Sequence, residues 1–201
     1  MNTISLRLRP AATYRVPDSI ARPLMISLFA AGTALGAYVR VPLPFTPVPL
    51  TLQTFFVLAA GIMLGGRGGL WSQLMYILAG IAGLPVFTGG AGLACLAGPT
   101  GGYIAGFAAA ALFIGIMFHR GVLRGRGRIY DCGLIVGGIA IIHISGAFFL
   151  STVLGIPAPK AFLIGSVPFL PGAFIKGIAL YGLMDYRKKT LAAESECCPE
   201  K

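Results

Sequence analysis

The chain has 201 residues, of which 56% are hydrophobic and 11% are charged, and its mean hydropathy is +0.84. A soluble domain carries roughly 25% charged residues, so this chain could not cover its own surface in water. The composition excludes an ordinary soluble domain and predicts an all-α integral membrane protein, because continuous apolar runs without two-residue alternation argue against a barrel.

Six apolar runs predict six transmembrane helices, each near the ~20 residues that cross a bilayer. We expect them at residues 23–40, 50–66, 69–85, 102–118, 133–154 and 167–185. On this reading, residues 1–22 form a basic N-terminal segment, residues 23–186 form the membrane domain, and residues 187–201 form a polar tail.

The basic residues predict the orientation of these helices. Most of the 16 lysines and arginines lie in the two tails and in the connections 65–69 and 119–131, and only Arg40, Lys160 and Lys176 lie elsewhere. Cytoplasmic connections of membrane proteins are rich in Lys and Arg, so we expect both termini in the cytoplasm. The net charge of +10 is then a topology signal rather than a nucleic-acid surface.

Three connections on the expected outer side are rich in Pro and Gly yet remain apolar, at residues 41–49, 84–101 and 155–172. Non-helical backbone near membrane depth is tolerated only where it is buried in protein or lines a cavity. We therefore expect these connections to fold back over the helices and enclose a ligand. Packing loops without a ligand are the alternative.

Residues for catalysis or metal binding are scarce in the predicted spans. They contain no Asp or Glu before Asp185 at the end of the last one, the four cysteines lack zinc-site spacing, and no phosphate-binding glycine loop occurs. His143 and Ser145 face different directions on a helix, so His143 is expected to be a hydrogen-bonded interior residue. The sequence predicts no enzyme, no metal and no cofactor, with any ATP hydrolysis left to another chain.

Lys176 lies inside the sixth predicted span. A lysine there costs roughly 2.5–3.5 kcal/mol on insertion scales and is a functional candidate. An anion arriving from outside would supply the partner that the membrane lacks. The alternative is a side chain that extends to the outer interface.

The first predicted span carries a stripe of small residues. Ala30, Ala34 and Ala37 follow i, i+4, i+7 spacing, which predicts a surface where a partner helix can approach closely. Ordinary packing within the chain is the alternative.

Four stretches, in order along most of the chain, resemble the BioY family, the biotin-binding S component of energy-coupling-factor (ECF) transporters. They are Pro44–Thr54, Gly83–Phe87, Gly98–Tyr103, and Pro168–Gly172 followed by Lys176. The resemblance implies a six-helix S-component fold in the cytoplasmic membrane and a biotin site near the outer face. It also implies partners, a transmembrane coupling protein and ABC-type ATPases, and supports Ala30 and Ala34 as the contact with the coupling protein.

The resemblance further implies which residues hold biotin. Lys176 would pair with the ligand carboxylate, and the remaining residues would hydrogen-bond the polar rings or enclose the apolar parts: Gln53, Thr100 and Tyr103 for the first role, and Phe87, Gly90 and Phe169 for the second.

One position departs from the family pattern, which has an aspartate three residues before the lysine, where this chain has Ala173. The change removes an acceptor for a ureido N–H and a counter-charge for Lys176. A lost hydrogen bond to a charged group costs roughly 1.5–3 kcal/mol, or about 10- to 150-fold in affinity. Weaker biotin binding, compensation elsewhere in the pocket, and a related ligand all remain open at this point.

Two other functions compete with vitamin capture. A self-sufficient secondary transporter of a small carboxylate-bearing vitamin is disfavoured because no coupling carboxylate is visible in the spans. An intramembrane enzyme is disfavoured further, because the spans offer no acid–base pair.

Overall fold

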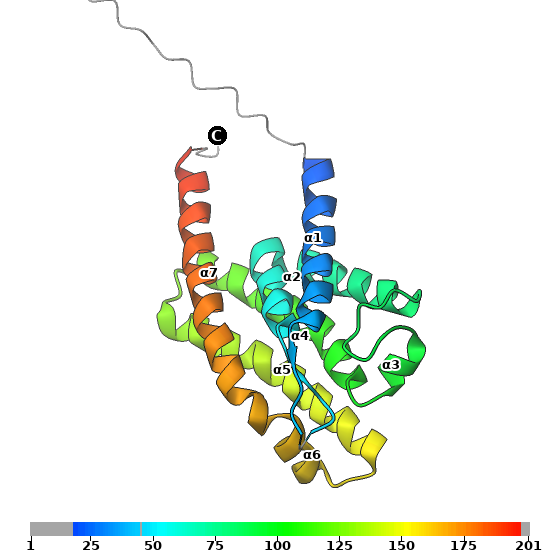
Figure 1. The fold of residues 1–201 in the computed structure, drawn as a ribbon. Helices are drawn as coiled ribbons and strands as arrows, with labels where there is room; N and C mark the ends of the chain where they lie inside the picture. The colour runs from blue at the N-terminus through cyan, green and yellow to red at the C-terminus, as the bar shows by residue number, and fades with distance from the viewer. Residues whose placement is uncertain (1–17, 45, 198–201) are drawn as a thin grey trace, which may run out of the picture.

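A computed structural model describes residues 18–44 and 46–197, and the chain is almost entirely helical there (Figure 1). The predicted N-terminal segment up to residue 17, Phe45 of the first motif, and the end of the tail from residue 198 lie outside the described residues. The elements in chain order are α1 (Asp18–Tyr38), β1 (Arg40–Val41), β2 (Leu50–Thr51), α2 (Gln53–Ile81), α3 (Leu93–Ala97), α4 (Gly101–Leu123), α5 (Arg128–Leu154), α6 (Ala158–Gly165), the 3-10 turn η1 (Val167–Phe169) and α7 (Leu170–Cys197).

Five of the described helical segments are long and apolar enough to cross a membrane, and α2 among them is interrupted at Gly65, where φ is 74° and ψ is 175°. A Cβ built on Gly69 would lie 2.8 Å from the Cα of Gly61. Eight residues of a straight helix span about 12 Å, so the chain doubles back at Gly65. The two halves of α2 account for the predicted spans at 50–66 and 69–85, and the chain is a multi-pass membrane protein.

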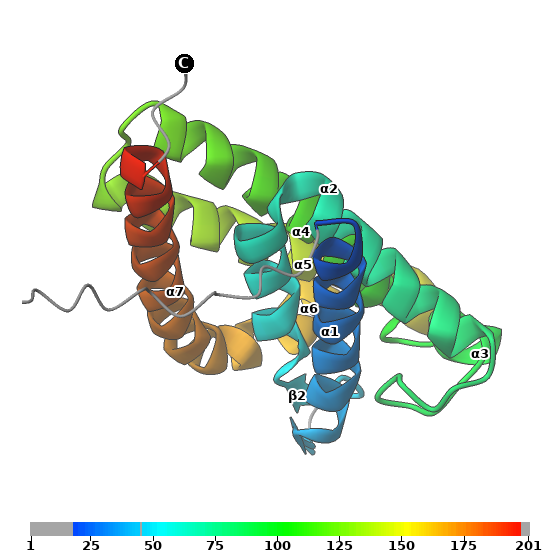
Figure 2. The same cartoon turned by 90° about the horizontal axis from the view of Figure 1, so that it is seen from above.

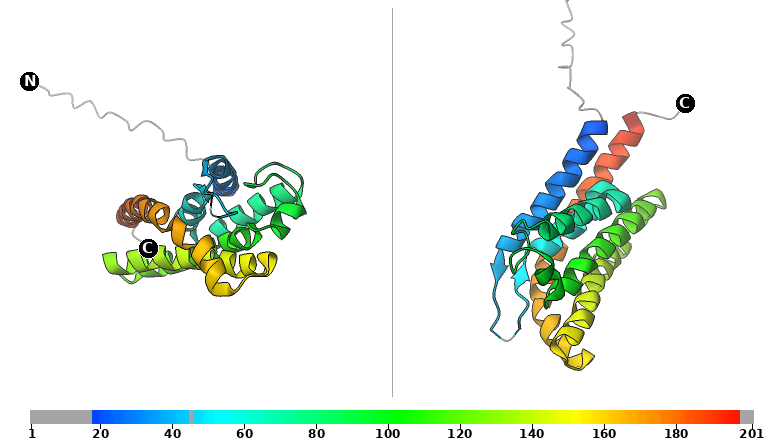
Figure 3. Two further views of the ribbon diagram at one scale, coloured as in Figure 1. Left: turned by 60° about the horizontal axis from the view of Figure 1, so that its bottom comes forward. Right: turned by 90° about the vertical axis from the view of Figure 1, so that its right-hand side faces the viewer.

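The described ends of the chain lie at the same end of the molecule, where α1 begins and α7 ends (Figure 1). Seen from above, α1 and α7 flank the first half of α2 (Figure 2). The β1–β2 hairpin and α6 lie toward the opposite end (Figure 3). The hairpin is antiparallel, with Arg40 opposite Thr51.

The connection at residues 155–172 was predicted to be non-helical, but most of it is helical. It contains α6 and η1, and Gly155 ends α5 in the left-handed conformation, with φ of 63°. Helical hydrogen bonds within α6 satisfy backbone groups that water reaches poorly near a bilayer.

Helix α7 also continues past the predicted end of the membrane domain at residue 186. Near that point Lys188 donates to the Asp131 carboxylate at 2.6 Å and to the Arg126 carbonyl at 3.1 Å. Asp131 is 5% exposed and lies in the first turn of α5, so this ion pair holds the C-terminal half of α7 against the beginning of α5. The division of the chain into segments stays a prediction.

Two of the three alanines of the small-residue stripe on α1 are buried within the chain. Ala30 and Ala37 are 6% and 3% exposed, while Ala34 is half-buried. Close packing against α2 explains this burial, because a Cβ on Gly32 of the same helix would lie 2.8 Å from the Phe56 ring. The expectation that Ala30, Ala34 and Ala37 contact another protein stays a prediction. The opposite face of α1 is exposed and carries large apolar side chains: Leu24, Leu28 and Leu35.

Glycine keeps α2 and α4 close where they cross. A Cβ on Gly115 would lie 2.5 Å from the Gly66 nitrogen and 2.7 Å from the Gly61 oxygen. Both neighbours are backbone atoms, which cannot turn aside as a flexible side chain could. Small residues at such crossings allow the van der Waals packing that holds membrane helices together.

We expect Gly115→Ala to destabilise the protein by about 1–3 kcal/mol through overpacking, seen as a lower Tm in detergent. The matched control is Gly133→Ala in α5, where a Cβ would meet no atom within 4 Å of its position. That variant should keep or slightly raise the Tm, because alanine favours helix more than glycine does. Equal Tm values for the two variants would contradict the close crossing.

Candidate ligand-binding site

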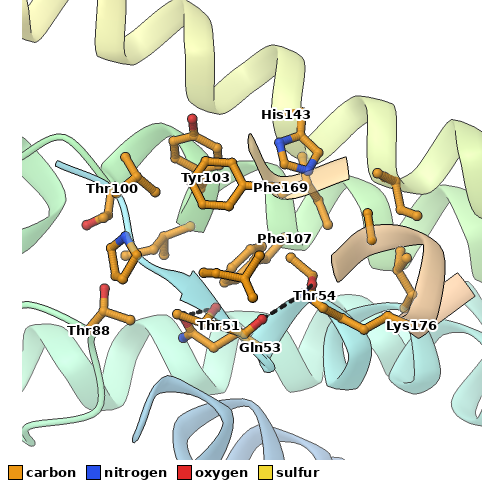
Figure 4. Close-up of a pocket in the computed structure, with 18 of the residues that line it drawn as sticks. Thr51, Gln53, Thr54, Thr88, Thr100, Tyr103, Phe107, His143, Phe169 and Lys176 are labelled. Carbon is orange, nitrogen blue, oxygen red and sulfur yellow. Dashed lines mark hydrogen bonds between the residues drawn. The ribbon is translucent and has the colours of Figure 1, made fainter. Parts of the chain in front are cut away.

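A cavity lies between α2, α4, α5 and α7 and is also lined by strand β2 (Figure 4). Six of the eight residues predicted for the ligand line it: Gln53, Thr100, Tyr103, Phe169, Ala173 and Lys176. Its other lining residues are mainly apolar, including Leu58, Ile104, Phe107, Ile139 and Ile142. In Figure 4 Lys176 lies at one side, Thr88 and Thr100 lie at the other, and Phe107 lies between them.

Lys176 extends from α7 to the beginning of α2. Its ammonium donates to the Thr51 carbonyl at 2.7 Å and to the Thr54 hydroxyl at 2.8 Å. Both partners are neutral, and no acidic side chain occurs among the described residues that line the cavity. The cavity therefore holds a positive charge that the protein solvates but does not neutralise. Neither Thr51 nor Thr54 was predicted, although both adjoin Gln53 in the first motif.

Two helices also direct their N-terminal ends toward this cavity. α2 begins at Gln53 and α4 begins at Gly101, next to the lining residues Thr51 and Thr100. A helix N-terminus carries a partial positive charge of about half an elementary charge. Together with Lys176 these ends make the cavity favourable for an anion.

The Gln53 side chain is fixed by a chain of hydrogen bonds. Its amide nitrogen donates to the Tyr76 hydroxyl at 2.5 Å, and that hydroxyl donates to the Val86 carbonyl at 3.3 Å. The Thr51 hydroxyl is 3.4 Å from the Gln53 amide oxygen. Gln53 is 4% exposed, so its amide is fixed in one orientation at the cavity wall.

Phe87 and Gly90 do not line this cavity, unlike the other six predicted residues. Phe87 is 4% exposed and packs edge to face on Tyr76, with ring centroids 5.5 Å apart. Gly90 has φ of 122° and exchanges two backbone hydrogen bonds of 3.1 Å with Phe87. Both residues therefore support Tyr76 and, through it, Gln53, instead of enclosing a ligand directly.

Tyr103 and His143 form the aromatic wall opposite Gln53. The Tyr103 hydroxyl donates to the Gly165 carbonyl at 2.5 Å, which connects α4 to the end of α6. His143 stacks on Phe169 at 5.9 Å between centroids and meets Tyr103 edge to face at 6.2 Å. Among the described residues the buried His143 Nδ1 has no hydrogen-bond partner, while the ring hydrogen-bonds the backbone of Gly165, in keeping with the predicted hydrogen-bonded interior histidine. His143 was not expected in the site, since its neighbours in sequence carry no motif.

Comparisons with known proteins agree with this architecture. The model of the BioY family matches residues 10–193. The chain belongs to the BioY family. A biotin transporter BioY of Rhizobium etli is 37% identical over 162 residues, which cover 77% of this chain and 86% of the relative. A probable biotin transporter BioY of Lysinibacillus sphaericus is 56% identical over 97 residues, 48% of each chain.

The BioY fold is also confirmed by a solved structure. A crystal structure of the S-component for biotin from an ECF-type ABC transporter matches with a TM-score of 0.76 and 24% identity, over 87% of this chain and 93% of that one. The predicted six-helix S-component fold is therefore correct. Family membership places this BioY chain among transport proteins rather than enzymes.

We expect Tyr103→Phe to lower the stability of this BioY protein by about 1–3 kcal/mol, because it leaves the buried Gly165 carbonyl without its donor. Tyr38→Phe is the matched control, since the exposed Tyr38 hydroxyl donates to the Pro85 carbonyl at 2.5 Å. Water can replace that donor, so the Tm should fall less. Thermal unfolding in detergent compares the two, and a larger loss for Tyr38→Phe would contradict the prediction.

Proposed function

We propose that the chain is the biotin-binding S component of an ECF-type uptake transporter in the cytoplasmic membrane, with both termini in the cytoplasm. The observation that carries this proposal is Lys176, a cation with neutral partners in a largely apolar cavity. Biotin has a neutral hydrogen-bonding head, an apolar chain and a carboxylate. A mostly apolar pocket with a few placed polar groups suits such a ligand.

Each part of biotin has a matching part of the cavity. The ligand carboxylate pairs with Lys176 and lies within the field of the α2 N-terminus. Gln53 and Thr100 face the polar rings, while Phe107 and Phe169 pack on the apolar parts. The names of the BioY relatives and of the solved S-component support the choice of biotin over other carboxylates.

Transport requires partners on this proposal. The sequence has no nucleotide-binding loop, so ATP is hydrolysed by ABC-type ATPases joined through a transmembrane coupling protein. The exposed apolar face of α1 is the side of that helix open to such a partner or to lipid.

Replacing the cavity cation tests the carboxylate pairing. We expect Lys176→Ala to weaken biotin binding to the purified protein by about 10- to 150-fold, and to weaken binding of neutral biotin amide much less. The control is Lys160→Ala, because Lys160 is exposed on α6 and does not line the cavity. Equal losses for biotin and its amide would exclude the pairing. Absence of saturable biotin binding by the unaltered protein would overturn the proposed function.

Ala173 and Lys176 line the same cavity three residues apart on α7, as their helical spacing predicts. We expect Ala173→Asp to tighten biotin binding by about tenfold, because the new carboxylate accepts a ureido N–H in a charge-assisted hydrogen bond. Ala173→Asn is the control, which adds a neutral acceptor of similar size and should gain less. Weaker binding by the aspartate variant would mean that its charge competes with biotin for Lys176. Isothermal titration in detergent separates these outcomes.

A further inference from the structure

A second cavity adjoins the ligand-binding one on the side away from the described chain ends. It lies between the hairpin connection and the segment from Thr88 to Thr100, and three residues line both cavities: Pro49, Thr88 and Thr100. Several residues around this outer cavity are exposed, among them Pro42, Pro47 and Gly89, whereas the deeper cavity includes buried Gln53 and Tyr103. A ligand from the outer solution can therefore meet the outer cavity first.

Arg40 supplies a positive charge to this outer cavity. Its guanidinium donates to the Thr88 carbonyl, a neutral acceptor at the boundary between the two cavities. The sequence contains no Asp or Glu at residues 39–52, 82–101 or 155–172, which form this end of the molecule. The positive charge of Arg40 is therefore not offset by any acidic side chain of these segments.

The boundary between the cavities is also favourable for an anion. Thr100 lines both cavities and is the N-cap of α4, without a side-chain cap hydrogen bond. The partial positive charge of this helix end therefore lies between Arg40 and Lys176. Apolar walls of low dielectric strengthen such fields and raise the local concentration of an oppositely charged ligand.

We propose that the outer cavity is a first binding station, in which Arg40 captures the carboxylate of the ligand before it passes Thr88 and Thr100 to reach Lys176. The proposal rests on the proposed function, because it takes the ligand to be a carboxylate. Arg40 acts on the rate of association, since charges at the rim of a site change the association rate more than the final contacts.

Association kinetics of biotin with the purified protein at low ionic strength test this station. We expect Arg40→Gln to slow association by roughly threefold or more, the effect of one unit charge about 7 Å away in water. Arg40→Lys should keep most of the rate, because it keeps the charge. The control Lys160→Gln removes the exposed cation of α6, which lines neither cavity, and should leave the rate unchanged. Biotin amide should associate equally fast with all four proteins.

Equal biotin association rates for Arg40→Gln and the unaltered protein would overturn the station while leaving the proposed function intact. No biotin binding by the unaltered protein would overturn both. An equal slowing for biotin and its amide would show that Arg40→Gln acts through the lost Thr88 hydrogen bond, and would also overturn the capture role.

Cys95 provides a test that leaves Arg40 in place. It is half-buried and lines the outer cavity only. In a Cys132→Ser, Cys197→Ser, Cys198→Ser background, a neutral methanethiosulfonate attached to Cys95 should slow biotin association severalfold, because the added group narrows the outer cavity. Unchanged association after complete labelling would overturn the route through this cavity.

Discussion

The hydrocarbon of a bilayer offers no hydrogen-bond partner to a backbone amide, and this constraint governs where each part of the BioY chain can lie. Helices satisfy their own backbone, so they make up the spans. The reversal at Gly65 interrupts α2 at one end of the molecule, and the hairpin, α6 and η1 replace long helices at the other. Irregular backbone is thus gathered where it can line a cavity or reach water.

Charge is arranged under the same constraint. The basic connections and the Lys188–Asp131 ion pair lie toward the end that holds both described chain ends. The opposite end carries few charged residues, and two of its cations, Arg40 and Lys176, donate to neutral groups of the chain. A cation solvated by carbonyl and hydroxyl oxygens remains able to attract a carboxylate, which a neutralised ion pair would do poorly.

The polar wall of the cavity depends on residues that a ligand would not touch. Phe87 packs on Tyr76, Tyr76 accepts from Gln53, and Gly90 provides the backbone turn that seats Phe87. The motif residues of this chain therefore include supporting ones as well as residues that line the cavity. Such support matters because a fixed amide loses less conformational freedom on binding than a mobile one.

Sequence alone was sufficient for the membrane class, the six spans and six of the residues that line the cavity, because apolar length, charge placement and local motifs each reflect a constraint on a short stretch of chain. Lys176 stood out for the same reason, as a charge within an apolar run. The tertiary structure decided the rest. In the folded chain His143 stacks on Phe169, and Lys176 donates to Thr51 and Thr54. Ala30 and Ala37 are buried, and Phe87 packs on Tyr76 outside the cavity. These facts depend on which faces of distant helices meet, and that choice is made by packing between segments far apart in the chain.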